Sequence, residues 1–461
     1  MTPFRIGLVV NPVAGLGGRV GLKGSDGADV QERARALGAV PRAGERASAA
    51  LTELRARGVE FELLTVQGPM GAGAAADAGV RCVTLHSLRG GTAASGADRD
   101  QRESARPGAG GSLRDVAGTG RSAAGSAPHG AAGAALRGRA CATSARDTVA
   151  AVRALRAAGV RLLLFAGGDG TARDVHDALG GDTSDLPVLG IPTGVKMHSA
   201  VFAVNPRAAG EVAAAYVRDA GGVRLRRAEV MDRDEAALRE GRVTARLHGW
   251  LTVPFVPARV QQRKTGSSAV DPEAVGGLAA ELAERVAPPG RGCPSPDVAG
   301  REPIVAGRAV PRAPSGRLPA GLVLGPGTTT QGIAAALGAD VSPTGVNVLA
   351  LYGRSAIVVA HDATGDELLK LVEGRAVLIV LSPIGGQGFL LGRGNQQIGP
   401  ELIRAVGLER LVLVATEGKL AALGGRPLLL DSGDAALDAA LTGYRPVLTG
   451  RGTSTMYRIT T

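Results

Sequence analysis

The first 225 residues alternate short apolar runs with segments of helical periodicity. The apolar runs are rich in Val, Leu and Ile, as buried parallel strands are. We predict strands at residues 5–10, 61–66, 81–85, 161–166 and 187–191. Leu, Val and Ala recur every three or four positions at 47–57 and 145–157, which indicates amphipathic helices. This alternation favours a Rossmann-like α/β domain, in which helices cover a parallel sheet.

Two stretches break the pattern. Residues 88–140 contain no aromatic residue and consist mainly of Gly, Ala, Ser and Arg. Such a segment buries too little apolar surface to offset its chain entropy, so we expect a disordered insertion in the first domain. Residues 288–319 contain eight prolines, and we expect a loop there.

The second half of the chain has a different pattern. Short β-like runs occupy residues 243–256, 321–325, 346–351 and 356–361, and helices are expected at 329–337, 365–373 and 400–406. We therefore predict an α/β domain over residues 1–225 and a β-rich domain over residues 226–461.

Composition narrows the function classes. The net charge is +11, but aromatic residues make up only 2% of the chain and the arginines are scattered, which argues against a nucleic-acid-binding protein. No apolar run approaches the roughly 20 residues that a membrane span needs, and no secretory signal is evident, so we expect a cytoplasmic protein. Three widely spaced cysteines favour neither a disulfide framework nor a metal site.

The strongest chemical signal is the glycine-rich motif Gly167-Gly168-Asp169-Gly170-Thr171. It lies between a predicted strand and a helix expected from about Ala172. Glycines there let backbone N–H groups approach a phosphate, and the helix adds the positive end of its dipole. A carboxylate would repel a phosphate, so Asp169 makes sense if it accepts a proton from an attacking hydroxyl or engages a cation. The alternative is a plain strand-to-helix turn with Asp169 as the N-cap.

Two other loops follow predicted strands at the same edge. Thr193, Gly194 and Lys196 follow residues 187–191, where a hydroxyl and an ammonium suit a phosphate, although an ordinary Pro-Gly turn explains them equally. We expect His198 to pack or form hydrogen bonds rather than act as a base. Asn11 and the glycines that follow it suit a further phosphate loop, although they lack the spacing of the usual NTPase or dinucleotide loops.

The second domain contains two further glycine-rich motifs. Gly325-Pro326-Gly327-Thr328-Thr329-Thr330 gathers three hydroxyls at a predicted helix start, which favours nucleotide contact. Residues 385–397 are glycine- and glutamine-rich, and their amides suit recognition of a base, although a hairpin turn is the alternative.

Together these sequence motifs resemble those of the ATP-NAD kinase family, which shares its glycine signature with the diacylglycerol and sphingosine kinases. The narrower resemblance is to the AcoX-like branch of predicted ATP- or polyphosphate-dependent NAD kinases. It covers nearly the whole chain outside 88–140 and parts of 288–319, and it is carried by residues 11–15, 165–175, 191–203, 325–330 and 385–397.

The resemblance implies a kinase that phosphorylates the 2′-hydroxyl of the adenosine ribose of NAD to give NADP. Asp169 would be the base, Gly168, Gly170 and Thr171 would hold phosphates, and Thr328 and Thr329 would contact NAD. Arg173 and Asp174 stand where the lipid kinases have Asn-Glu, so they are expected to position the ribose or a cation.

The implied partners are NAD and ATP or polyphosphate, with Mg²⁺ or another divalent cation, in a homo-oligomer without nucleic acid or a membrane span. Two alternatives stay open on the residues: a kinase for another small or lipid alcohol, and a non-catalytic nucleotide-binding regulator. The absence of an evident amphipathic membrane helix argues against a lipid substrate.

Overall fold

The computed structural model describes residues 3–22, 28–85, 143–181, 186–194, 197–233, 245–257, 259–261, 271–286, 304–305, 308–309, 319–384 and 387–461. The expected insertion at 88–140 lies outside the described residues. Within the stretch expected to be a loop, Ile304–Val305 (β8) and Arg308–Ala309 (β9) form a short antiparallel pair.

The first sheet has five parallel strands in the order β3-β2-β1-β4-β5. All five predicted strands are present: β1 Phe4–Val10, β2 Phe61–Val66, β3 Cys82–Leu85, β4 Leu162–Gly167 and β5 Val188–Pro192. Every residue of β4 and β5 is buried, because helices cover both faces of a parallel sheet. The predicted α/β class of the first domain is confirmed.

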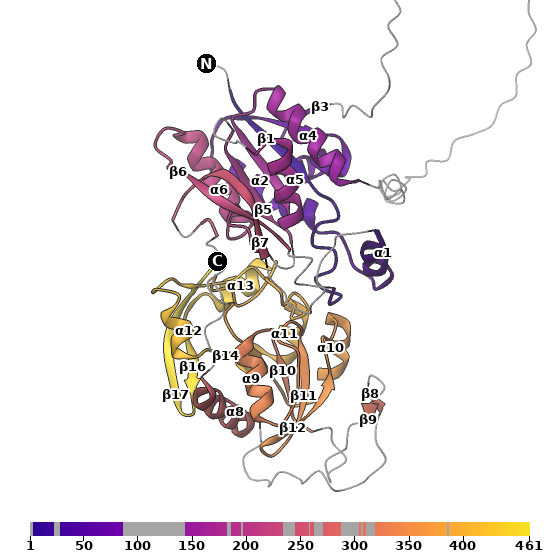
Figure 1. The fold of residues 1–461 in the computed structure, drawn as a ribbon, viewed down its shortest axis with the longest axis vertical. Helices are drawn as coiled ribbons and strands as arrows, with labels where there is room; N and C mark the ends of the chain where they lie inside the picture. The colour runs from indigo at the N-terminus through magenta and orange to yellow at the C-terminus, as the bar shows by residue number, and fades with distance from the viewer. Residues whose placement is uncertain are drawn as a thin grey trace, which may run out of the picture. The chain divides into compact units, whose positions relative to one another are not determined.

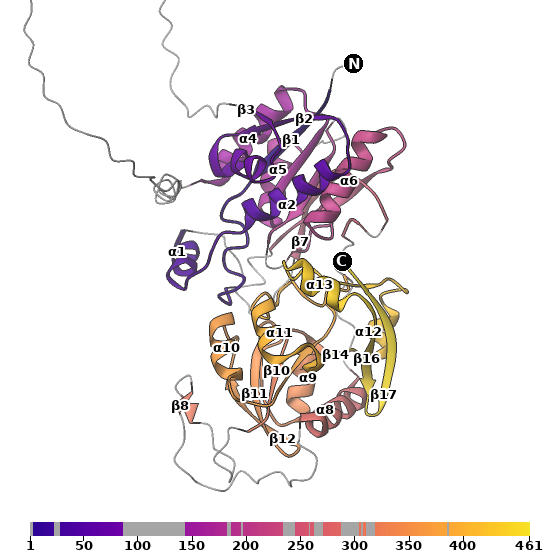
Figure 2. The same cartoon turned by 180° about the vertical axis from the view of Figure 1, so that it is seen from behind.

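Helices cover this sheet in packed pairs. α2 (Ala43–Ala56) packs against α6 (Pro206–Arg218), and α4 (Ala145–Ala157) packs against α5 (Asp169–Ala178) (Figures 1 and 2). The remaining elements are α1 (Ala28–Ala36), η1 (Gly68–Met70) and α3 (Ala72–Asp77). The predicted helix at 145–157 is exact, and the one at 47–57 starts four residues earlier, at Ala43.

A hairpin of β6 (Leu225–Arg233) and β7 (Ala245–Pro254) follows α6. It begins at the boundary that we expect near residue 225, but its buried residues Ala228, Val230, Leu251 and Val253 belong to the core of the first sheet. The exact domain boundary therefore stays a prediction.

The second sheet is mixed and has eight strands in the order β12-β11-β10-β13-β14-β16-β17-β15. Its centre, β10-β13-β14-β16, is parallel, and antiparallel pairs flank it. The strands are β10 Gly321–Leu324, β11 Asn347–Tyr352, β12 Ser355–Ala360, β13 Val377–Leu381, β14 Leu411–Val414, β15 Leu428–Leu429, β16 Gly443–Gly450 and β17 Thr453–Thr460. The β-rich second domain is confirmed.

The helices of this part include those predicted at 329–337, 365–373 and 400–406. They are α8 Pro272–Val286, α9 Thr328–Ala336, α10 Gly365–Val372, α11 Pro400–Val406, η2 Leu408–Arg410, α12 Glu417–Ala421 and α13 Ala435–Leu441. Two apolar clusters draw on alternate strand residues, for example Val323 in one and Leu322 and Leu324 in the other. No helix among the described residues is long and apolar enough to cross a membrane.

One buried carboxylate joins distant parts of the chain. Asp431 Oδ2 accepts from Arg46 Nη2 of α2 at 2.5 Å and from Arg393 Nη1 at 2.7 Å. Arg393 Nη2 also donates to the carbonyl of Val204 at 2.9 Å, and Arg46 Nε donates to the carbonyl of Pro192 at the end of β5. Burial lowers the pKa of Arg393 to about 10, while Asp431 opposes the shift. Asp431 thus neutralises two guanidinium groups away from water.

We predict that Asp431→Asn lowers the free energy of unfolding by about 3 kcal/mol, because it leaves two buried cations without their counter-charge. Chemical denaturation of the full chain measures the change. The matched control is Glu62→Gln, which removes the half-exposed Arg5–Glu62 pair and should cost less than about 1 kcal/mol. Equal losses in the two variants would contradict the role of Asp431.

Candidate functional site

The site predicted from the first domain lies at the carboxyl ends of β1, β4 and β5. β1 and β4 are neighbours, but the chain continues from β1 to one side of the sheet and from β4 to the other. Loops leaving such a switch point diverge and open a crevice for ligands. Asn11 follows β1, Gly168 and Asp169 follow β4, and Thr193 follows β5, so the sheet brings the predicted residues to one edge.

α5 begins earlier than predicted. Its N-cap is Gly168 and its first residue is Asp169, whereas we expected the helix from about Ala172. The backbone N–H of Ala172 is the first to bond within the helix, to the Gly168 carbonyl at 3.0 Å. The amides of Asp169, Gly170 and Thr171 are therefore first-turn donors without intrahelical partners, as an anion site requires. Asp169 is not the N-cap of the alternative interpretation.

Asn11 and Thr171 bond to each other directly. Asn11 Nδ2 donates to Thr171 Oγ1 at 3.0 Å, and Asn11 Oδ1 accepts from the amide of Val13 at 3.2 Å. Thr171 is buried, with 3% of its surface exposed. This pair holds the loop after β1 against the first turn of α5, so its first role is to shape the turn.

The loop after β5 approaches both of these loops closely through its backbone. Gly15 has a φ of +77°, and a Cβ on it would lie 1.9 Å from the carbonyl oxygen of Thr193. A Cβ on Gly194 would lie 3.0 Å from the Cα of Gly168. The amide of Thr193 donates to the carbonyl of Gly167 at 2.9 Å. The glycines are needed at these positions because the backbone of another loop occupies the space that a side chain would need.

The Asp169 carboxylate is held by His198 and Ser199, in the segment that follows the loop after β5. Oδ2 accepts from the amide of His198 at 2.8 Å and lies 3.2 Å from His198 Nδ1, while Oδ1 accepts from the amide of Ser199 at 3.0 Å. The side chain is 14% exposed. A carboxylate offers about four acceptor positions, so one position on Oδ1 remains for a further donor. His198 is the hydrogen-bonding residue that the sequence suggests.

Arg173 and Asp174 face a different partner. Arg173 Nη1 lies 3.3 Å and 3.2 Å from the two carboxylate oxygens of Asp232 on β6, and Arg173 Nη2 lies 3.9 Å from Asp174 Oδ1. Asp232 was not predicted from the sequence, because only the folded hairpin brings it to α5. The contacts tie α5 to β6.

A cavity of about 730 Å³ opens beside the loop after β5. Its lining includes Gly15, Thr193 and Gly194 of the first domain and Arg393 and Asp431 of the second. Thr193 Oγ1 is buried and has no hydrogen-bond partner among the described residues. A buried hydroxyl without a hydrogen-bond partner destabilises the fold, and a ligand that forms a hydrogen bond with it offsets this cost. The cavity volume is typical of small-molecule sites.

The motif of residues 325–330 in the second domain belongs to a separate cluster of polar side chains at the carboxyl edge of β10, β13 and β14. Thr329 Oγ1 lies 3.2 Å from Lys419 Nζ, which also donates to Ser382 Oγ at 2.9 Å. Thr330 Oγ1 donates to the carbonyls of Gly325 and Gly327, while Thr328 begins α9. Burial lowers the pKa of Lys419 to about 8. Lys419 and Ser382 were not predicted as site residues, although the scarcity of lysine in this chain singles Lys419 out.

Three positions named in the predicted loops are not described. Lys196 lies outside the described residues, as do Gly385 and Gly386 of the second-domain loop. From the remainder of that loop, Gln387 Nε2 donates to the carbonyl of Met197 at 3.3 Å. This contact brings the loop to the segment that holds Asp169.

We predict a specific pH dependence for Lys419. Its folded pKa of about 8 lies below that of an unfolded lysine, so the folded state loses this proton first and stability rises as pH increases. Between about pH 7.5 and 9.5 the free energy of unfolding of the wild type should rise by about 2 kcal/mol relative to Lys419→Met. Denaturation at several pH values measures the difference. Parallel curves for the two proteins would show that Lys419 titrates normally.

Comparison with family models gives two matches. The ATP-NAD kinase N-terminal domain matches residues 6–220, and the ATP-NAD kinase C-terminal domain matches residues 322–459. Comparisons with curated proteins and with solved structures gave no match. The two matches cover both sheets and the Gly167–Thr171 turn. The chain therefore belongs to the ATP-NAD kinase family, which phosphorylates NAD to NADP with ATP.

Proposed function

We propose that Asp169 is the general base of this NAD kinase. The observation that carries the proposal is the hydrogen bonding of its carboxylate: the amides of His198 and Ser199 fix both oxygens, and one acceptor position on Oδ1 remains. A base must be fixed in direction and still able to take one proton. Asp169 meets both requirements at the edge of the sheet where ligands bind.

In the proposed step, Asp169 accepts the proton of the ribose 2′-hydroxyl as that oxygen bonds to the terminal phosphorus of ATP. The bond from this phosphorus to the bridging oxygen breaks, and ADP leaves with the electron pair. Phosphoryl transfer depends mainly on positioning and on neutralising charge. The first-turn amides of α5 at Gly170 and Thr171 supply fixed positive charge for the transferred group.

The cavity beside Thr193 is proposed to hold one of the two nucleotides. Gly194 lines it and also packs on Gly168, so a ligand in the cavity would lie next to the glycine turn. Its lining holds basic residues, such as Arg19 and Lys370, together with acidic ones, such as Asp366 and Glu401, so charge alone does not select its ligand. The hydroxyl of Thr193 would donate to a phosphate or ribose oxygen.

A divalent cation fits this site as a companion of the nucleotide. In the described part of the chain, no group of three or more His, Cys, Asp or Glu side chains surrounds Asp169. Mg²⁺ commonly binds through substrate phosphates, waters and one or two carboxylates, so a full protein cage is not needed. The cation would neutralise charge on the phosphates. Polyphosphate as an alternative donor, the homo-oligomer and the cytoplasmic location stay predictions.

We expect Asp169→Asn to lower NADP formation from NAD and ATP at least about 100-fold, because it removes the proton acceptor. An enzymatic NADP assay with ATP and, separately, polyphosphate measures the rate and identifies the donor. The variant should also lose about 1–3 kcal/mol of stability, since an amide NH₂ would face one of the backbone N–H donors. Asp340→Asn, at an exposed position, is the control and should keep the wild-type rate. A near-normal rate in Asp169→Asn would refute the role, and no NADP from either donor with the wild type would refute the activity.

Thr193→Val separates a binding role from a structural one. Removing a hydroxyl that has no described partner should leave the free energy of unfolding unchanged or slightly higher. If this hydroxyl binds substrate, KM for NAD or ATP should rise about tenfold. Kinetics with each substrate varied in turn, together with thermal denaturation, test both points. An unchanged KM for both substrates would exclude the contact.

A further inference from the structure

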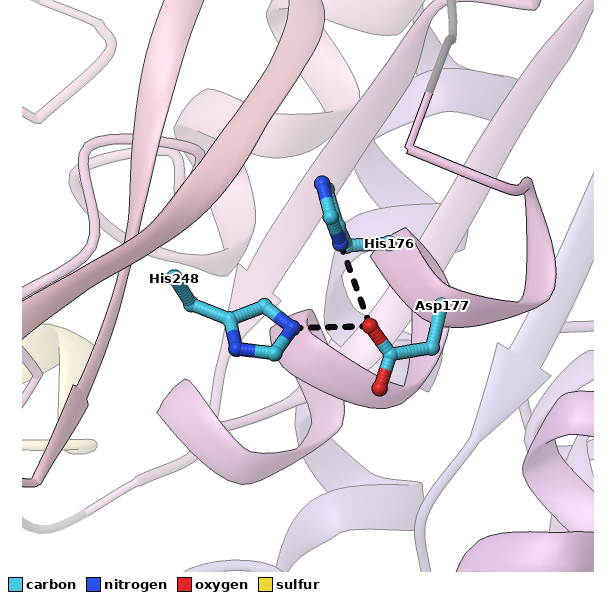
Figure 3. Close-up of side chains that lie close together, drawn as sticks. All are labelled: His176, Asp177 and His248. Atoms are coloured by element: carbon cyan, nitrogen blue, oxygen red, sulfur yellow. Dashed lines mark hydrogen bonds and ion pairs between the residues drawn. The ribbon is translucent and has the colours of Figure 1, made fainter.

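Three side chains of types that ligate metals lie close together at the far end of α5. His176 and Asp177 are consecutive residues near the C-terminal end of that helix, and His248 lies on β7 (Figure 3). Asp177 Oδ1 is 2.7 Å from His248 Nε2 and 3.2 Å from His176 Nδ1. One ligand atom from each residue lies within 4.8 Å of the other two. The arrangement is built from two imidazoles and one carboxylate around a single point.

A β-bulge directs His248 to this point. In the pairing of β6 with β7, Val230 is opposite Gly249 and Met231 is opposite Leu247, so His248 is the extra residue. A bulge re-aims a side chain that would otherwise follow the alternation of the strand, and bulges are frequent next to functional sites. Since β6 holds no residue opposite His248, its side chain is directed by the bulge toward α5.

Gly249 makes room for the second imidazole. A Cβ at this position would lie 2.2 Å from His176 Nε2. The His176 and His248 rings are 5.0 Å apart between centroids and nearly perpendicular, at 75°. The His176 side chain is only 14% exposed and that of His248 only 22%, so surrounding residues limit their movement. The donors are therefore largely preorganised.

We propose that His176, Asp177 and His248 bind a divalent transition-metal ion, with Zn²⁺ as the fitting cation. Imidazole nitrogen and carboxylate oxygen are the usual zinc donors, whereas Mg²⁺ prefers oxygen. In a tetrahedral zinc site the ligand atoms lie about 3.3 Å apart, so small side-chain rotations close this group around an ion. Asp177 is 52% exposed, which leaves access for the ion and for water as a further ligand.

This site is separate from the proposed catalytic turn. His176 follows Asp169 by seven positions on the same helix, which corresponds to about 10 Å along its axis. The ion would join α5 to β7 and would not contact the transferred phosphate. The inference therefore does not depend on the proposed role of Asp169.

Isothermal titration of the full chain, prepared without a polyhistidine tag, tests the proposal. ZnCl₂ should bind at about one equivalent with Kd below about 10 µM, and MgCl₂ should not compete. His248→Ala and Asp177→Asn should each weaken Zn²⁺ binding at least about tenfold. The matched control is His361→Ala, at an exposed position outside the group, and it should bind as the wild type does.

A second measurement keeps the test decisive if a variant does not fold. Wild-type protein titrated with Co²⁺ should develop the visible absorption of a site with nitrogen and oxygen ligands, and Zn²⁺ should displace it. Absence of saturable Zn²⁺ binding to the wild type would overturn the proposal. So would unchanged affinity in folded His248→Ala and Asp177→Asn, or a Co²⁺ spectrum equal to that of the free ion.

Discussion

The site depends on the contact of three loops at one edge of a parallel sheet. Because β1 and β4 are neighbours at the point where the strand order reverses, the turns after them must share a narrow space with the loop after β5. Backbone meets backbone there: Gly15 lies over the carbonyl of Thr193, and Gly194 lies over Gly168. Gly168 of the family signature, together with Gly15 and Gly194, thus serves the packing between loops.

Backbone amides also hold the carboxylate of Asp169 beside the proposed anion site. Asp169 lies at the start of α5, where the helix dipole favours negative charge, and it accepts the amides of His198 and Ser199. These interactions direct the carboxylate toward protein donors. The positive first turn of α5 and the carboxylate of Asp169, the proposed base, therefore lie side by side.

The sequence was most informative where a signal is local. Buried strands are continuous apolar runs, so both sheets and the glycine turn could be predicted from short windows, whereas the start of α5 was misplaced because glycine and aspartate suit loops as well as first turns. Partners distant in the chain could not be predicted. Asp232 reaches Arg173 only through the β6–β7 hairpin, and Lys419 reaches Thr329 only through the parallel order of β10, β13 and β14.

The β6–β7 hairpin is the common support of these features. The amide of Ala200 bonds to the carbonyl of Glu229, and the amide of Met231 bonds to Ser199 Oγ, so β6 fixes the segment that orients Asp169. Asp232 of the same strand binds Arg173 in the middle of α5, and His248 of β7 reaches the end of that helix. α5 and the segment that holds its first carboxylate are therefore anchored to one hairpin. An ion at the distal end of α5 would strengthen this anchor. The proposed metal site would therefore influence the position of Asp169 through the hairpin, without contacting that residue.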